Sequence, residues 1–131
     1  MIILKTAETL TVSRKGLLTY IVFTEDDDEK MYLKIIKYVS KTAKKRKGSH
    51  THHKIPFDKI FECLFKYRYL MCSKDFSDVF PPDTDSNNYA FLAAALRNEG
   101  LLIASGDLHI IQHNIISDWE AKTLALPRLT S

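Results

Sequence analysis

Nine positively charged side chains and no negatively charged ones lie between residues 30 and 54. They are Lys30, Lys34, Lys37, Lys41, Lys44, Lys45, Arg46, Lys47 and Lys54. Residues 1–54 carry 12 basic and 6 acidic side chains (+6) and residues 55–131 carry 7 and 10 (−3), which gives the net charge of +3. A concentrated field of one sign attracts polyanions, above all nucleic acid. The alternative interpretation is a solvated helix face that leads into a disordered loop.

Three histidines in the same stretch suggest a second kind of chemistry. His50, His52 and His53 are close together, and imidazole is a ligand for Zn, Cu and Ni. A structural zinc site needs four ligands, usually from a paired Cys or His motif, and Cys63 and Cys72 do not form such a pair. We therefore expect no metal and no cofactor, although the spacing leaves metal binding by this loop open. Cys63 is expected to be a buried free thiol.

The N-terminal half combines strand signals with one ambiguous segment. Residues 2–4, 10–12 and 17–23 are β-prone, with a turn at 13–16. In the lysine-rich part, Met31, Ile35 and Val39 recur at every fourth position, which predicts an amphipathic helix over 28–46 with a basic face. The alternative is a strand over 31–39 that forms a hairpin through the acidic residues 24–29.

The C-terminal half has clearer helix signals. Apolar residues at helical spacing after Pro56 predict a helix over 56–69. Ser73 can cap a short helix over 74–79, and Asp85 or Ser86 can cap a third over 87–98, with Gly100 as its C-cap. The expected buried face of that third helix is Tyr89, Leu92, Ala93 and Leu96.

The end of the chain predicts a hairpin and one more helix. Residues 101–104 and 108–111 are β-prone, and Gly106-Asp107 between them suits a two-residue type II′ turn. His113, beyond the second strand, is expected to face solvent or to hold a backbone group. Ser117 and Glu120 form a capping box that predicts a helix to about residue 124.

Three helices with a short middle one, followed by a hairpin that opens "RNEGLL…SGDLHII", resemble the winged helix-turn-helix superfamily over residues 55–112. In such domains the third helix commonly enters the DNA major groove. The matching segment here is 87–98, where Asn87 and Asn88 could contact adenine edges or simply start the helix. This segment departs from the DNA-reading pattern, because Asp83 and Asp85 precede it and Arg97 is its only basic side chain.

A second resemblance concerns carboxylates. Asp83 and Asp85 before a helix, and Asp107 after the apolar run 101–104, are similar to the end of PIN-domain ribonucleases. That family gathers a divalent metal between such carboxylates to activate water. The chain lacks the Asp that PIN domains place after their first strand, so the resemblance implies at most a second alternative.

The expected fold class is α+β. A small N-terminal β element with a basic helix (1–47) and a basic, histidine-rich loop (48–54) precede a winged-helix-like three-helix and hairpin unit with a short C-terminal helix (55–131). The expected function is non-enzymatic nucleic-acid binding, with DNA favoured over RNA and a homodimer as the expected assembly; the alternative is a protein–protein interaction module. The chain has no membrane-length apolar run and no leader, so we expect a cytoplasmic, intracellular protein. The predicted nucleic-acid contacts are Lys34, Lys37, Lys41, Lys44, Lys45, Arg46, Lys47, Lys54, Asn87, Asn88 and Arg97.

Overall fold

The computed structural model describes residues 1–13, 16–25, 30–40, 53–82, 84–85, 87–105 and 112–116. Four antiparallel strands form one sheet in the order β1 (Ile2–Leu10), β2 (Gly16–Thr24), β3 (Met31–Ser40) and β4 (Ile55–Pro56). The chain continues through α1 (Phe57–Tyr67), β5 (Leu70–Cys72), the 3-10 helix η1 (Ser73–Val79), α2 (Asn87–Asn98), β6 (Leu102–Ala104) and β7 (Gln112–Ile115). A second antiparallel sheet has the order β5-β7-β6. The α+β class is confirmed.

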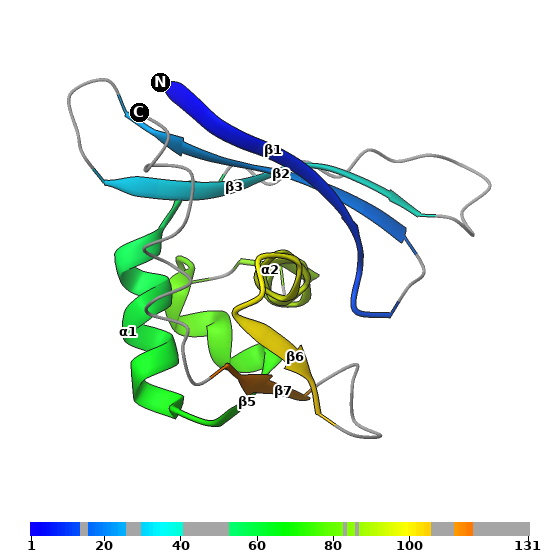
Figure 1. Cartoon of the computed structure of the whole chain (residues 1–131), viewed down its shortest axis with the longest axis vertical. Coiled ribbons are helices and arrows are strands. Elements are labelled where there is room, and N and C mark those ends of the chain that lie inside the picture. Colours follow the sequence, from blue (N-terminus) through cyan, green and yellow to red (C-terminus); the bar gives the residue numbers. More distant parts are fainter. Residues whose placement is uncertain are drawn as a thin grey trace.

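The elements lie in three layers (Figure 1). The large sheet forms one side of the molecule, the helices pack beneath it, and the small sheet lies on the far side of the helices. Helix α1 begins beside the large sheet and runs away from it towards β5. The two ends of α1 therefore belong to opposite sides of the protein.

The segment expected to be a basic helix over 28–46 is a strand over its described part. Strand β3 pairs with β2 along its whole length, from Met31 opposite Thr24 to Ser40 opposite Gly16. The helix prediction was wrong because a spacing of four is also an even spacing, so Met31 and Ile35 share one face of a strand as well as of a helix. Pairing with the β-branched and aromatic strand β2 decides the outcome, as β-propensity depends on cross-strand neighbours.

A β-bulge in β3 changes which residues face the core. Tyr20 is opposite Ile35 but Thr19 is opposite Lys37, so Ile36 is the extra residue. Before the bulge, Met31, Leu33 and Ile35 are buried in the core; after it, Tyr38 packs its ring on Phe91 of α2 at 4.8 Å between centroids. The bulge therefore allows both halves of β3 to contribute to one core.

Three of the four helices expected in the C-terminal half are confirmed, although the N-cap of η1 is Cys72 and not Ser73. Helix α1 and η1 lie within one or two residues of the expected ranges, and α2 has the expected bounds. The carboxylate of Asp85 accepts a hydrogen bond from the backbone N–H of Asn87 at 2.9 Å, which caps α2. Gly100 has a φ of 81°, the left-handed conformation expected after a helix.

Three other expectations need correction or lie outside the described residues. The separate strands at 2–4 and 10–12 are replaced by one strand, β1. In the small sheet Ala104 pairs with His113, whereas a two-residue turn at Gly106-Asp107 requires Ala104 opposite His109. The strand that pairs with β6 is thus 112–115, while residues 108–111, the turn itself and the helix expected over 117–124 are not among the described residues.

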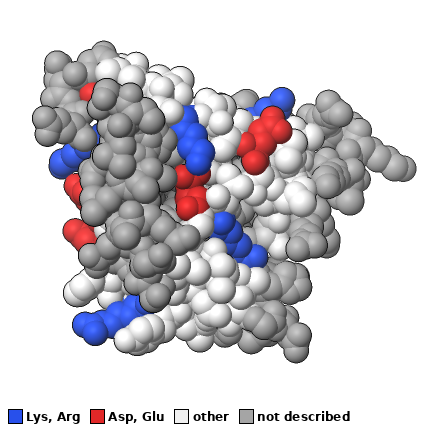
Figure 2. Space-filling view, in the orientation of Figure 1, with Lys and Arg blue, Asp and Glu red and all other residues white. Residues whose placement is uncertain are grey.

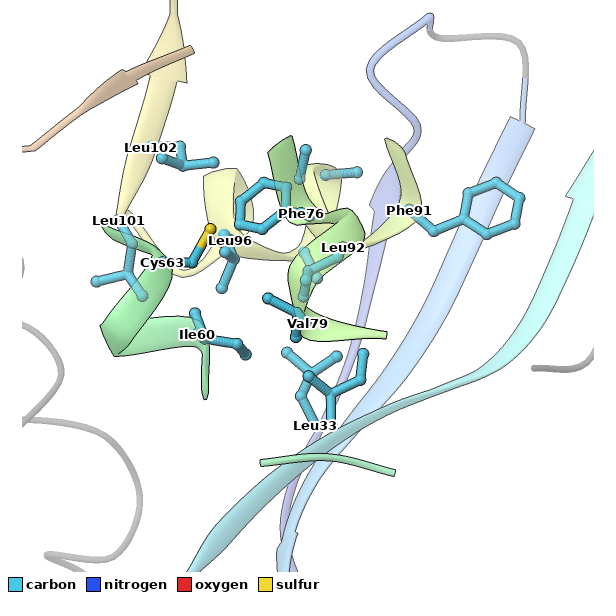
Figure 3. Close-up of a cluster of buried hydrophobic side chains, with 14 of the residues drawn as sticks. Leu33, Ile60, Cys63, Phe76, Val79, Phe91, Leu92, Leu96, Leu101 and Leu102 are labelled. Atoms are coloured by element: carbon cyan, nitrogen blue, oxygen red, sulfur yellow. The ribbon is translucent and has the colours of Figure 1, made fainter. Parts of the chain in front are cut away.

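One hydrophobic core joins the two halves of the chain. Leu33 of β3, Ile60 of α1, Phe76 of η1 and Leu92 of α2 are all fully buried members of the same cluster. Figure 3 shows Leu33 reaching from the large sheet towards Val79 and Leu92, and Phe91 pointing from α2 towards the strands. Cys63 lies in this core, and both cysteines are free as expected.

The pairing of β2 with β3 predicts a specific steric coupling. A Cβ added to Gly16 would lie 2.8 Å from the ring carbon Cζ and from the hydroxyl oxygen of Tyr38. We expect Gly16→Ala to lower the free energy of unfolding by about 1–3 kcal/mol through overpacking. In a Tyr38→Leu background the same substitution should cost almost nothing, because the ring is gone. Urea denaturation of the four proteins measures this coupling, and an equal cost in both backgrounds would contradict the register.

Candidate nucleic-acid interface

Two of the predicted cations share the outer face of the large sheet. Lys34 is opposite Ile21 and Lys37 is opposite Thr19, and both partners lie on the face of β2 away from the main core. Residues 34 and 37 are an odd number apart, so in a regular strand they would point to opposite faces. The bulge at Ile36 restores Lys37 to the outer face. The strand thus presents two lysines side by side and then leads into residues 41–47.

Lys54 also lies on this face. Its Nζ is 4.6 Å from the centroid of the Tyr32 ring and 3.0 Å from Oε1 of Glu25. The Tyr32 ring stacks on Phe23 at 5.6 Å, and together with Ile21 these residues form a small second cluster on the outer face. A cation over an aromatic face is favourable. The outer face therefore gathers Lys34, Lys37 and Lys54, with the charge of Lys54 partly balanced by Glu25.

Five further cations of the basic stretch follow β3 in the sequence. Lys41, Lys44, Lys45, Arg46 and Lys47 lie outside the described residues, as do His50 and His52. On the face drawn in Figure 2, blue and red side chains are interspersed, and the described residues form no patch of a single sign there. The densest run of cationic residues in the sequence thus follows directly after β3.

The two asparagines at the start of α2 have different surroundings. Asn87 is exposed. Asn88 is only 6% exposed, and its Nδ2 donates to the backbone oxygen of Asp85 at 3.0 Å. In this position the buried Asn88 amide cannot contact the edge of a base. Its role is to stabilise the start of α2. Asp85, the carboxylate of the PIN-like pattern that is described, acts as the α2 cap.

A groove runs along the accessible side of α2. Two cavities of about 360 Å³ and about 280 Å³ adjoin one another at Thr11 and Val12 of the β1–β2 turn region. On the helix side they are lined by residues at helical spacing, namely Asn87, Ala90, Phe91, Ala94, Arg97 and Asn98. The structure thus brings Asn87 and Arg97 into one groove, separate from the lysines of β3. Residues 9–13 face the helix across this groove, so α2 does not stand clear of the molecule as a helix in a major groove must.

A polar chain joins α2, the small sheet and η1, and its two ends, Arg97 and Ser73, line the groove. Arg97 Nε donates to Nδ1 of His113 at 2.9 Å, and Nε2 of His113 lies 2.7 Å from Oγ of Ser73. Because Nδ1 accepts, the ring proton is on Nε2 and is donated to the serine oxygen. Such a histidine cannot take a proton from Ser73. The arrangement is therefore a structural clamp and not a nucleophile with its base.

A second polar cluster joins the end of α2 to the large sheet. The Glu99 carboxylate is 1% exposed, accepts a hydrogen bond from the Tyr20 hydroxyl, and is 2.7 Å from Nζ of Lys5. Asn98 Nδ2 donates to the same hydroxyl at 2.8 Å. Burial raises the pKa of Tyr20, so its proton stays available to Glu99. The cluster fixes the angle between α2 and strands β1 and β2.

Sequence reasoning missed both clusters. It expected His113 to face solvent or hold a backbone group, but the side chain is fully buried. The one sequence feature that could have indicated these clusters is local. Three consecutive polar residues, Arg97 to Glu99, end an Ala- and Leu-rich helix. Among their partners, Tyr20 lies 79 residues before Glu99 and Lys5 lies still further away in the sequence, and no spacing rule identifies them.

The described residues contain no group of three or more metal-ligating side chains. Cys63 is not a nucleophile, because burial, with smaller contributions from Asp78 and Asp75, raises its thiol pKa to about 12. His53 lies against the Phe80 ring, 5.8 Å between centroids. The chemistry available to the described site is thus hydrogen bonding and ion pairing.

The His113 clamp predicts a specific acid sensitivity. Burial, and then the charge of Arg97, lowers the pKa of His113 from 6.5 to about 4. The unfolded chain therefore binds this proton more readily, so the stability contribution is present above pH 6.5 and is lost as pH falls towards 4. The loss should approach about 3 kcal/mol. Urea unfolding from pH 7.5 to 4 should show this slope in the parent and a shallower one in His113→Asn; identical slopes would contradict the clamp.

None of the described helices is long and apolar enough to cross a membrane. Comparison of the chain with protein-family models, with curated proteins and with solved structures finds no match.

Proposed function

We propose that the chain binds nucleic acid through phosphate contacts made by β3 and the basic segment that follows it, with little dependence on base sequence. The observation that carries the proposal is the placement of Lys34 and Lys37 on one outer face by the bulge at Ile36. Strand β3 then leads into five further cations at 41–47. Phosphate contacts supply affinity without sequence information, whereas base contacts specify.

The low sequence dependence follows from the state of α2. We propose that residues 55–116 form a winged-helix-like scaffold, which the order of α1, η1, α2 and then the antiparallel strands β6 and β7 supports. In this chain the middle of α2, Phe91 to Leu96, is buried along six consecutive residues. Its remaining accessible side faces the β1–β2 turn region across the groove. The scaffold therefore holds the basic sheet, and α2 does not read bases.

The contribution of the described lysines is expected to be the smaller one. Glu8 lies on the same outer face, two strands from Lys37 in the row Glu8–Thr19–Lys37, and Glu25 pairs with Lys54. The positive charges of Lys37 and Lys54 are thus partly balanced by nearby carboxylates. The five cations at 41–47 have no acidic neighbour in the sequence from 30 to 54 and should supply most of the affinity.

A salt titration of binding tests the proposal. Each lost phosphate contact should reduce the slope of log K against log salt by about 0.9 on duplex DNA and about 0.7 on single strands. The double variant Lys34→Gln, Lys37→Gln should lose up to about 2 phosphate contacts, and the slope should fall by the corresponding amount. Glutamine at all five positions 41, 44, 45, 46 and 47 should remove most binding.

Lys59→Gln with Lys74→Gln is the matched control, because both lysines are exposed on α1 and η1 and the charge change equals that of the β3 pair. It should leave the slope and the affinity unchanged. Unrelated sequences of equal length should bind alike. Undiminished binding by the five-residue variant, or equal losses in the control, would refute the proposal.

A further inference from the structure

We infer that the outer side of α1 and the turn that follows it form a docking surface for a positively charged segment of a partner protein with apolar anchor residues. This surface is independent of the nucleic-acid contacts proposed above. It runs along α1 from the first turn, beside the large sheet, to the end of the helix that is remote from this sheet (Figure 1).

The surface begins as a shallow concavity on α1. Asp58, Phe61, Glu62 and Phe65 line a space of about 460 Å³, and their spacing places them on one side of the helix. Phe65 is 62% exposed, although it is a large aromatic residue. Phe61 beside it is half-buried against the core, so the concavity combines one exposed and one partly accessible aromatic ring, and aromatic residues are enriched at interaction sites.

A strained turn extends the surface beyond the helix. Arg68 has φ 65° and ψ −55°, and the N–H of Tyr69 donates to the carbonyl oxygen of Tyr67 at 2.7 Å. These values define a classic γ-turn, which is rare and strained. The turn leaves Tyr69 76% exposed and Leu70 45% exposed. Strain of this kind persists where the resulting presentation of side chains has a use.

The small sheet continues the apolar surface. Its register places Leu70, Asn114 and Ile103 in one row across β5, β7 and β6. Ile103 is 50% exposed, whereas the neighbouring row of Leu102 and Ile115 is buried. The exposed row therefore belongs to the outer face of this sheet, next to Tyr69.

The charges around the concavity select a cationic occupant. Among the described residues no ion pair engages Asp58 or Glu62, while Lys66 on the same helix is paired with Asp78 at 3.3 Å. The guanidinium of Arg68 lies 5.4 Å from the centroid of the Phe65 ring, so this aromatic ring already accepts a cation. An apolar partner without cations would desolvate both carboxylates uncompensated, whereas lysine or arginine beside its anchor residues would pair with them.

The test uses a labelled amphipathic helical peptide with Leu and Phe on one face and Lys on the other, and a second peptide with Glu in place of Lys. Anisotropy titration should show binding of the Lys peptide only, and amide chemical shifts should change along α1 and at 68–70. Phe65→Ala should weaken binding about tenfold or more. Asp58→Lys with Glu62→Lys should reverse the preference between the peptides.

Ile3→Ala and Glu8→Lys are matched controls on the large sheet, where both residues are exposed, and should leave peptide binding unchanged. Circular dichroism checks that each variant folds, and nucleic-acid affinity should be the same in Phe65→Ala as in the parent. Equal binding of both peptides, or an unchanged affinity in Phe65→Ala, would overturn the inference. Self-association at high concentration that Phe65→Ala abolishes would assign the surface to a second copy and would also overturn it.

Discussion

Burial of α2 between the two sheets is the constraint on which the rest of the structure depends. Six consecutive residues, Phe91 to Leu96, are buried, so the helix has neighbours on nearly every side. Its apolar side chains complete the core with β3, α1 and η1, and its polar end is tied to the large sheet through Glu99 and to the small sheet through Arg97. A helix buried in this way stabilises the fold by packing along its whole length. Helix α2 thus packs against the apolar sides of both sheets, together with α1 and η1.

This burial separates the fold from the function that its element order would imply. A helix that reads bases must project into the major groove of DNA. In this protein, the accessible side of α2 instead faces the β1–β2 turn region across the groove on the protein surface. The cationic residues that we propose for phosphate contacts lie instead on the opposite face of the large sheet, where one bulge aligns Lys34 with Lys37. The proposed function therefore belongs to a different layer from the buried helix, as is general when sites are built on common scaffolds.

The parts of the structure that the sequence predicted are those determined by local interactions. The bounds of α2 follow from an Asp at its start and a Gly just after its end, and α1 follows from apolar residues at helical spacing. Strand β3 was predicted as a helix because its spacing fits both structures, and only its pairing with β2 decides between them. Strand β6 pairs in a register four residues later than expected, with His113 in place of His109 opposite Ala104, because a local turn signal does not determine the pairing across a sheet. The contacts of Glu99 and His113 were not predictable, because each joins residues distant in sequence.

Hydrogen exchange of the protein with and without nucleic acid tests the central claim most directly, because it reports on β3 and α2 in the same experiment. The amides of β3 and of residues 41–54 should exchange more slowly in the complex, while the amides of 91–96 in α2 should keep the rates of the free protein. Faster exchange in α2 on binding, or new protection there without protection of β3, would mean that the helix leaves the core to read the nucleic acid. Either result would contradict the account.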